Sequence, residues 1–350
     1  MQYFLPAISA LSLTILSTLI ALKVFPKLGL LDKPEKYGIK RKPIPYPGGI
    51  LLWVIFILLA MIFFEPTFKL IGLLFGSGLL VLISFIDDRI SLPAWLRLAV
   101  QILVALIMVV AGIGVETITN PFGGYIALDK IKFILDVGDT ELTIMAFSGI
   151  FTLIWIVLIV NTMNWLDGIP GLTSGITFIG CLTLFFLSIS DLVNQPETAT
   201  LALIVAMIAL GMWLFDFYPP KILIGDSGSM LFGLLLAVLA IFSGGKIATA
   251  FLIMGFPIMD AIYVIVHRIY NKQAPWKGGE WDKNRKAVHL HHRMLQFGMS
   301  ERQVLFSIYA LAAIFGISAL FMGTQGKFWA IIIIFFLSFL LGILLRVKKK

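Results

Sequence analysis

The chain has 350 residues, of which 59% are hydrophobic and 13% charged, and its mean hydropathy is +1.00. Soluble domains carry about 25% charged residues, so the composition excludes an ordinary soluble protein and indicates a polytopic membrane protein. The net charge of +8 gives no reason to expect a nucleic-acid partner, because excess Lys and Arg in membrane proteins usually encode orientation.

Eleven apolar runs are long enough to cross a bilayer, which takes about 20 residues. The first run lacks a basic leader and a small-residue cleavage site, so we expect a retained helix there. The sequence therefore predicts an all-α polytopic membrane protein of about eleven transmembrane helices, forming one integral membrane domain over residues 1–350. The runs are 4–24, 48–64, 69–86, 94–113, 142–160, 171–190, 198–216, 228–243, 246–267, 304–323 and 327–346.

One long loop, 114–141, contains two short apolar runs, 123–128 and 132–137, around a polar turn. This pattern predicts a small extracytoplasmic β-hairpin that pairs the two runs.

The basic residues fall unevenly between the two sets of loops. Of the 27 Lys and Arg, 22 lie near the loops on one side and 5 near those on the other. The positive-inside rule makes the first side cytoplasmic. We therefore expect a multi-pass plasma (inner) membrane protein with its N-terminus outside, its C-terminus inside, and every polar motif described below on the cytoplasmic side.

Two motifs come first along the chain. Lys42 precedes a segment of prolines and glycines, 43–49, and could hold a phosphate as a point charge, although a basic anchor facing acidic lipid is the favoured explanation of this motif taken alone. Asp87 and Asp88 end the apolar run 69–86. Acids at a membrane edge indicate function, and paired carboxylates can bind Mg²⁺ or separate in pKa so that one acts as a base.

The third motif repeats polar residues every three positions. Asn161, Asn164 and Asp167 would share one face of a helix end, where amides and a carboxylate can recognise a base or a sugar by hydrogen bonds. A capped helix C-terminus is the alternative, and it explains Gly168 but not both asparagines.

The fourth motif, 225–229, opens the eighth apolar run with small residues around Asp226. Asp226 could be a plain N-cap. Small residues at a helix start also form an anion site of backbone N–H groups, and Asp226 could hold the Mg²⁺ of a bound phosphate.

The fifth motif contains His289, His291, His292 and Arg293. Its close spacing is a poor zinc signature, and histidines with an arginine suit a polyanion better, with a solvated loop as the alternative.

Asp260 lies inside the ninth apolar run, and Arg268 follows two turns later. The motifs together suit Mg²⁺-assisted chemistry on a nucleoside diphosphate. An ion-coupled transporter is the alternative from another class, but its charges would lie near the membrane midplane. That transporter would use Asp87, Asp88, Asp226 and Asp260.

In their order along the chain, these motifs resemble the polyprenyl-phosphate N-acetylhexosamine-1-phosphate transferases. This family includes phospho-MurNAc-pentapeptide translocase and the undecaprenyl-phosphate GlcNAc-1-phosphate transferases. The resemblance covers almost the whole chain. It implies transfer of a sugar-1-phosphate from a UDP-N-acetylhexosamine to polyprenyl (undecaprenyl) phosphate with release of UMP, the first membrane step of cell-envelope glycan synthesis, such as that of lipopolysaccharide or teichoic acid. It also implies a Mg²⁺ cofactor that Mn²⁺ can replace, contact with membrane lipid, and compatibility with a homodimer.

The motifs and the resemblance together assign roles to twelve residues. The catalytic residues are Asp87, Asp88, His289, His291 and His292; the metal ligands are Asp226, Asp87 and Asp88; and the substrate-binding residues are Lys42, Asn161, Asn164, Asp167, Arg268 and Arg293.

The histidine segment, 289–302, resembles the GlcNAc-1-phosphate branch, as does the count of eleven spans. The expected product is therefore lipid-linked GlcNAc-1-phosphate, and the pentapeptide transferase is the alternative within the family. Pro170 stands where the family usually has a second Asp, which allows a different hexosamine donor.

Overall fold

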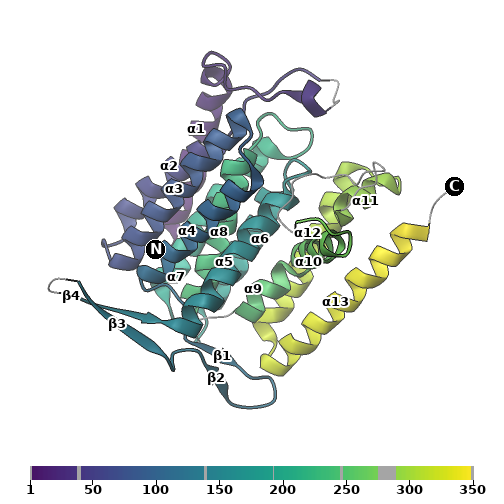
Figure 1. Ribbon diagram of the computed structural model, residues 1–350. Coiled ribbons are helices and arrows are strands. Elements are labelled where there is room, and N and C mark those ends of the chain that lie inside the picture. Colours follow the sequence, from purple (N-terminus) through teal and green to yellow (C-terminus); the bar gives the residue numbers. More distant parts are fainter. Residues whose placement is uncertain are drawn as a thin grey trace.

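The computed structural model describes residues 2–37, 41–137, 140–191, 193–244, 247–274 and 289–347 as a bundle of helices with four short strands at one end (Figure 1). The helices are α1 (Phe4–Val24), η1 (Pro34–Tyr37), α2 (Gly49–Phe63), α3 (Phe68–Ile90), α4 (Ala94–Val110), α5 (Ala146–Leu166), α6 (Leu172–Ile189), α7 (Pro196–Asp216), α8 (Gly225–Phe242), α9 (Ile247–Ile253), α10 (Gly255–Tyr270), α11 (Leu290–Gln296), α12 (Glu301–Phe321) and α13 (Thr324–Val347).

Every one of the eleven predicted runs contains a helix. Within the described residues, eight helices are long and apolar enough to cross a membrane, or nine if the bent pair α9–α10 counts as one span. Two further apolar helices, α2 and α4, are shorter, with 15 and 17 residues. The prediction of an all-α polytopic membrane protein is confirmed.

Helix α8 lies at the centre of the bundle, with α2, α3, α5 and α6 packed around it. Sixteen of its 18 residues are buried, and the two exceptions are Asp226 and Phe242. The start of α2 comes so close that a Cβ on Gly49 would collide with the backbone of Ser227 and Gly228. The first turn of α8 is therefore fixed by its neighbours, while Asp226 reaches the surface.

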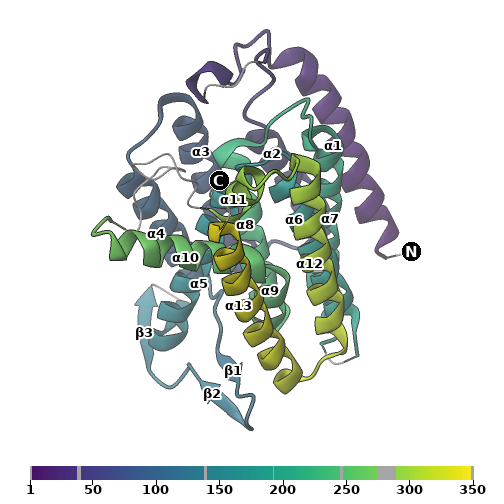
Figure 2. The ribbon, with the colours of Figure 1, turned by 90° about the vertical axis from the view of Figure 1, so that its right-hand side faces the viewer.

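The ninth predicted span is not one straight helix. It breaks between α9 and α10, whose axes differ by 84°, and Figure 2 shows α10 running across the bundle. Pro257 has no N–H to donate to Ile253, the last residue of α9, and this accounts for the break. Asp260 and Arg268 consequently lie on a helix that does not follow the other spans.

The predicted pairing of the two loop segments is wrong. Strand β2 (Tyr125–Ala127) pairs with β1 (Thr117–Thr119), and β3 (Lys132–Val137) pairs with β4 (Thr140–Met145), both antiparallel. Alternating apolar residues identify a strand without selecting its partner, and each run pairs with a neighbour that the prediction left out. Because β4 takes up residues 140–145, α5 begins at Ala146 and not at residue 142.

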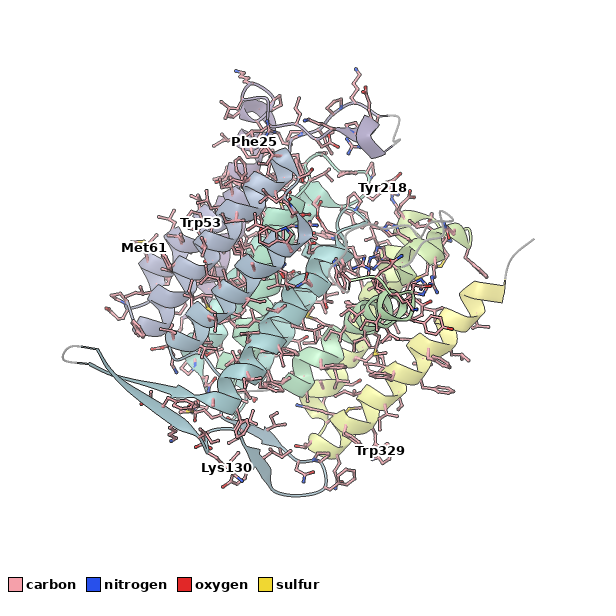
Figure 3. The ribbon with its side chains drawn as sticks, viewed as in Figure 1. Phe25, Trp53, Met61, Lys130, Tyr218 and Trp329 are labelled. Carbon is pink, nitrogen blue, oxygen red and sulfur yellow. The ribbon has the colours of Figure 1, made fainter. Side chains whose placement is uncertain are left out.

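The two ends of the bundle differ. Figure 3 shows Phe25 and Tyr218 near one end and Lys130 and Trp329 near the other, where the strands lie. The loop of Tyr218 leads directly into α8, so the first turn of α8 lies at the end opposite the strands. The segment before the histidines, 275–288, and the last three residues, 348–350, lie outside the described residues.

Candidate active site

Asp88, in the last turn of α3, caps the start of α8 from outside that helix. Its carboxylate accepts hydrogen bonds from the backbone N–H groups of Asp226 (2.8 Å) and Ser227 (3.2 Å), from the Ser227 hydroxyl (2.8 Å) and from the Tyr46 hydroxyl. The N-cap residue of α8, Ile224, has no side chain that could do this. The amide groups that the sequence suggested for a phosphate therefore hold Asp88 instead.

Asp87 accepts its hydrogen bonds from other groups than Asp88 does. Its side chain is buried and accepts from the backbone N–H of Leu92 and from Arg97 Nη1, which lies 3.1 Å from Oδ2. The same Arg97 nitrogen lies 3.2 Å from Oδ2 of Asp226. Asp87 and Asp226 thus come from different helices and converge on one point.

The two asparagines of α5 are held by neighbouring helices. Asn161 Nδ2 donates to Gln101 Oε1 on α4 at 2.5 Å, and Asn164 Nδ2 donates to Ser229 Oγ on α8 at 3.2 Å. Asn164 lies next to the first turn of α8, while Asn161 lies one turn deeper in the bundle.

Asp167 follows α5 as its C-cap and accepts from the Thr173 hydroxyl at 3.0 Å. Burial, together with the negative charge of Asp216, raises the pKa of Asp167 well above its ordinary value. A carboxyl group that keeps its proton readily suits a hydrogen bond to a neutral base or sugar. Asp216 holds the same loop by accepting from the N–H of Gly171 (3.0 Å) and the hydroxyl of Ser174 (2.8 Å).

The three histidines gather around Asp260. His289 Nδ1 lies 2.9 Å and His291 Nδ1 lies 3.7 Å from Asp260 Oδ2, and Oδ1 accepts from the N–H of Leu290 at 2.7 Å. Burial lowers the pKa of His292 to about 3, and the neighbouring histidines act in the same direction. The lowered pKa favours the neutral form of His292, whose two ring nitrogens can then offer one hydrogen-bond donor and one acceptor.

The histidine segment lies against the loop that follows α5. A Cβ on Gly168 would lie 2.7 Å from His292 Nε2 and 2.8 Å from His291 Nε2. The histidine segment and the loop after α5, which are more than a hundred residues apart in the sequence, therefore lie against each other in the candidate site.

The basic residues predicted to bind the substrate lie in different surroundings. Arg268 is buried over the indole of Trp165, at 5.1 Å from the ring centroid, and Trp165 in turn lies beside His289. Arg293 Nη2 donates to the Tyr263 hydroxyl at 2.8 Å.

Lys42 is exposed. Among the described residues, no hydrogen bond or ion pair joins its side chain to the acidic cluster formed by Asp87, Asp88 and Asp226. Its segment nevertheless adjoins the start of α8, because Leu223 N donates to Pro45 O and Gly48 N donates to Leu223 O.

Among the described residues, two groups of side chains could hold a metal ion. Asp87 and Asp226 offer carboxylate oxygens near one point, a donor set that suits Mg²⁺. The ligand atoms of Asp260, His289 and His291 lie within 4.8 Å of one another. The second group combines one carboxylate with two imidazole nitrogens, so the first group, which offers carboxylate oxygens alone, fits a hard cation better.

The comparison with protein families decides between an enzyme and a transporter. Residues 70–244, half of the chain, match the model described as glycosyl transferase family 4. The chain belongs to glycosyl transferase family 4. Its matched region runs from α3 to the end of α8 and so contains the two Asp residues, the α5 motif and Asp226. The protein is a glycosyl-1-phosphate transferase, and the transporter alternative is set aside.

Similar proteins cover nearly the whole length. One is the probable undecaprenyl-phosphate N-acetylglucosaminyl 1-phosphate transferase of Bacillus subtilis, 29% identical, with 97% of this chain and 90% of that protein covered. Another is the undecaprenyl-phosphate α-N-acetylglucosaminyl 1-phosphate transferase of Escherichia coli K12, 27% identical over 95% and 88%. A third, the decaprenyl-phosphate N-acetylglucosaminephosphotransferase of Mycolicibacterium smegmatis, is 29% identical over 84% and 75%.

Three residues that contact members of the candidate site were not predicted from the sequence. They are Arg97, which the sequence identifies only as one of the 22 basic residues on the predicted cytoplasmic side, Gln101 and Asp216. A signal existed, because Arg97 and Gln101 stand four residues apart on one face of an apolar helix, and Asp216 ends another.

Proposed function

We propose that the protein transfers N-acetylglucosamine-1-phosphate from UDP-N-acetylglucosamine to undecaprenyl phosphate and releases UMP. The observation that carries this proposal is the convergence of Asp87 and Asp226, beside Asp167 and the histidine segment, in a member of family 4. The names of the relatives supply the lipid acceptor and the transferred N-acetylglucosaminyl 1-phosphate group.

In the proposed reaction, an oxygen of the lipid phosphate attacks the β-phosphorus of the donor, and the bond to the UMP oxygen breaks. A Mg²⁺ ion held by Asp87 and Asp226 would neutralise the charge on the diphosphate. Asp87 also orients the lipid phosphate and can accept a proton from it. Asp88 keeps the first turn of α8 in place, and so positions Asp226.

The remaining motifs would bind the donor. Asn164 and Asp167 lie next to the first turn of α8 and offer hydrogen bonds to the nucleotide, and Asn161, which donates to Gln101, is the third substrate-binding residue of this motif. The histidines face the Asp167–Gly168 loop and would contact the diphosphate. Arg268 and Arg293 lie on the α10–α11 side and supply positive charge, while Lys42 would act from the exposed loop before α2.

For the donor, we expect UMP release by the purified protein with undecaprenyl phosphate to be fastest from UDP-N-acetylglucosamine. A compact donor needs no peptide-binding surface, and a site that hydrogen-bonds sugar hydroxyls discriminates strongly among hexosamines. The measurement is a competition among UDP-sugars that includes UDP-MurNAc-pentapeptide. Faster release from the pentapeptide donor would contradict the branch, and activity with another hexosamine alone would keep the reaction and remove N-acetylglucosamine.

For orientation, we propose that the active-site end is cytoplasmic, since 22 of 27 basic residues fall near the loops on that side of the predicted topology. A cysteine added after Lys350 is expected to react with a membrane-impermeant thiol reagent only in broken cells. Cys181 is buried and leaves the background low. Labelling in intact cells would reverse the topology.

A further inference from the structure

Arg97 occupies the point on which the two candidate metal ligands converge. Its Nη1 atom lies 3.1 Å from Asp87 Oδ2 and 3.2 Å from Asp226 Oδ2, so one nitrogen bridges two carboxylates. The Asp87 side chain is 4% exposed, whereas those of Asp226 and Arg97 are 32% and 27% exposed. A cation from solution can therefore reach this point from the Asp226 side.

Arg97 is held in this position by its own helix. Gln101, one turn later on α4, is buried, accepts from Asn161 at 2.5 Å and lies 3.8 Å from the sulfur of Met230. Residues four apart share a helix face, so the contacts that fix Gln101 against α5 and α8 also direct Arg97 towards Asp226. The bridge is thus a product of helix packing and not of a mobile surface side chain.

The third carboxylate of the cluster does not take part. Asp88 is engaged by two backbone amides and two hydroxyl groups at the start of α8. Asp87 and Asp226 are therefore the carboxylates that face a side-chain cation. A divalent ion that binds the Oδ2 atoms of both carboxylates would take the place of the guanidinium nitrogen.

We propose that Arg97 is a positioning residue that holds Asp87 and Asp226 together in the metal-free protein and competes with the divalent cation for them. This inference rests on the proposed metal site. Two carboxylates that converge without a counter-charge repel one another, and the guanidinium relieves this repulsion. The same bonds must be given up when the metal binds, so Arg97 keeps the affinity of the substrate-free protein for the cation low.

The test is Mn²⁺ binding to the full-length protein in detergent without nucleotide, followed by the electron paramagnetic resonance of free Mn²⁺. We expect Arg97→Gln to lower the Kd for Mn²⁺ about tenfold, the effect of one competing charge-assisted hydrogen bond. A merely structural role cannot produce this result, because a damaged site loses affinity.

The chain offers a matched control. Arg89 lies eight positions before Arg97, and its guanidinium donates to the backbone carbonyl of Gly29 at 3.1 Å. Arg89→Gln should leave the Kd unchanged. Arg97→Lys, which keeps the charge, should stay near the wild type, and adding Asp226→Asn to Arg97→Gln should abolish the gain.

Each possible Mn²⁺-binding result bears on either the role of Arg97 or the metal site itself. Unchanged or weaker binding in Arg97→Gln, with Asp226-dependent binding in the wild type, would overturn the role of Arg97 and leave the metal site standing. No Mn²⁺ binding in either protein would overturn both. If Arg97→Gln does not fold, Arg97→Met keeps the aliphatic stem, and the same tenfold gain is expected of it.

Discussion

Replacing Asp226 by Asn is expected to lower metal-dependent UMP release about a thousandfold while the protein remains folded. An amide cannot replace an anionic metal ligand, and Asp226 is one of the two carboxylates at the point where the metal would bind. Stability should change little, because the side chain is 32% exposed and its ion pair is with the partly exposed Arg97. The measurement is UMP release at saturating Mg²⁺ and substrate, alongside thermal unfolding in detergent.

Asp129 provides a control for this variant. It is a carboxylate of similar exposure, 38%, that pairs with Lys132 near the strands. Asp129→Asn should retain full activity. Near-normal turnover in Asp226→Asn would reject Asp226 as a metal ligand.

Replacing Asp88 by Ala is expected to lower the free energy of unfolding by about 3 kcal/mol and to remove activity with it. The substitution leaves two backbone N–H groups at the start of α8 and two hydroxyl groups without their acceptor. Asp88→Asn keeps one acceptor oxygen and should fall between Ala and the wild type. The measurement is the thermal unfolding temperature in detergent.

The Asp88 result distinguishes two roles for the carboxylate. If Asp88 acted mainly on the metal, both variants would lose activity and keep the wild-type unfolding temperature. Asp191→Ala, at an exposed position after α6, should leave both quantities unchanged.

The helices could be predicted because each is an apolar run of membrane length, a property that local composition determines. The run 69–86 predicts α3, and its polar ending at Asp87 and Asp88 indicates a site at the helix mouth. Pro257 is present in the sequence as a residue that breaks helices, but the length of the apolar run predicts a single span over 246–267.

Pairings between distant segments could not be predicted in the same way. The strand 132–137 has the same alternation whether it pairs with 123–128 or with Thr140–Met145. Likewise, the sequence predicts Asp88 as a catalytic residue and metal ligand, while its hydrogen bonds with the backbone N–H groups of Asp226 and Ser227 could be found only in the structure. Arg97 also belongs to the candidate site through a contact between distant segments, its ion pair with Asp226.

The most direct measurement of the proposed reaction follows the β-phosphorus of the donor. UDP-N-acetylglucosamine carrying radioactive phosphorus at the β position would be incubated with the purified protein, Mg²⁺ and undecaprenyl phosphate, and the lipid would then be extracted. Transfer of the sugar-1-phosphate predicts that the label enters the lipid in step with UMP release, and that Asp226→Asn prevents both. Label that stays in the aqueous phase as UDP, while the sugar alone enters the lipid, would contradict it.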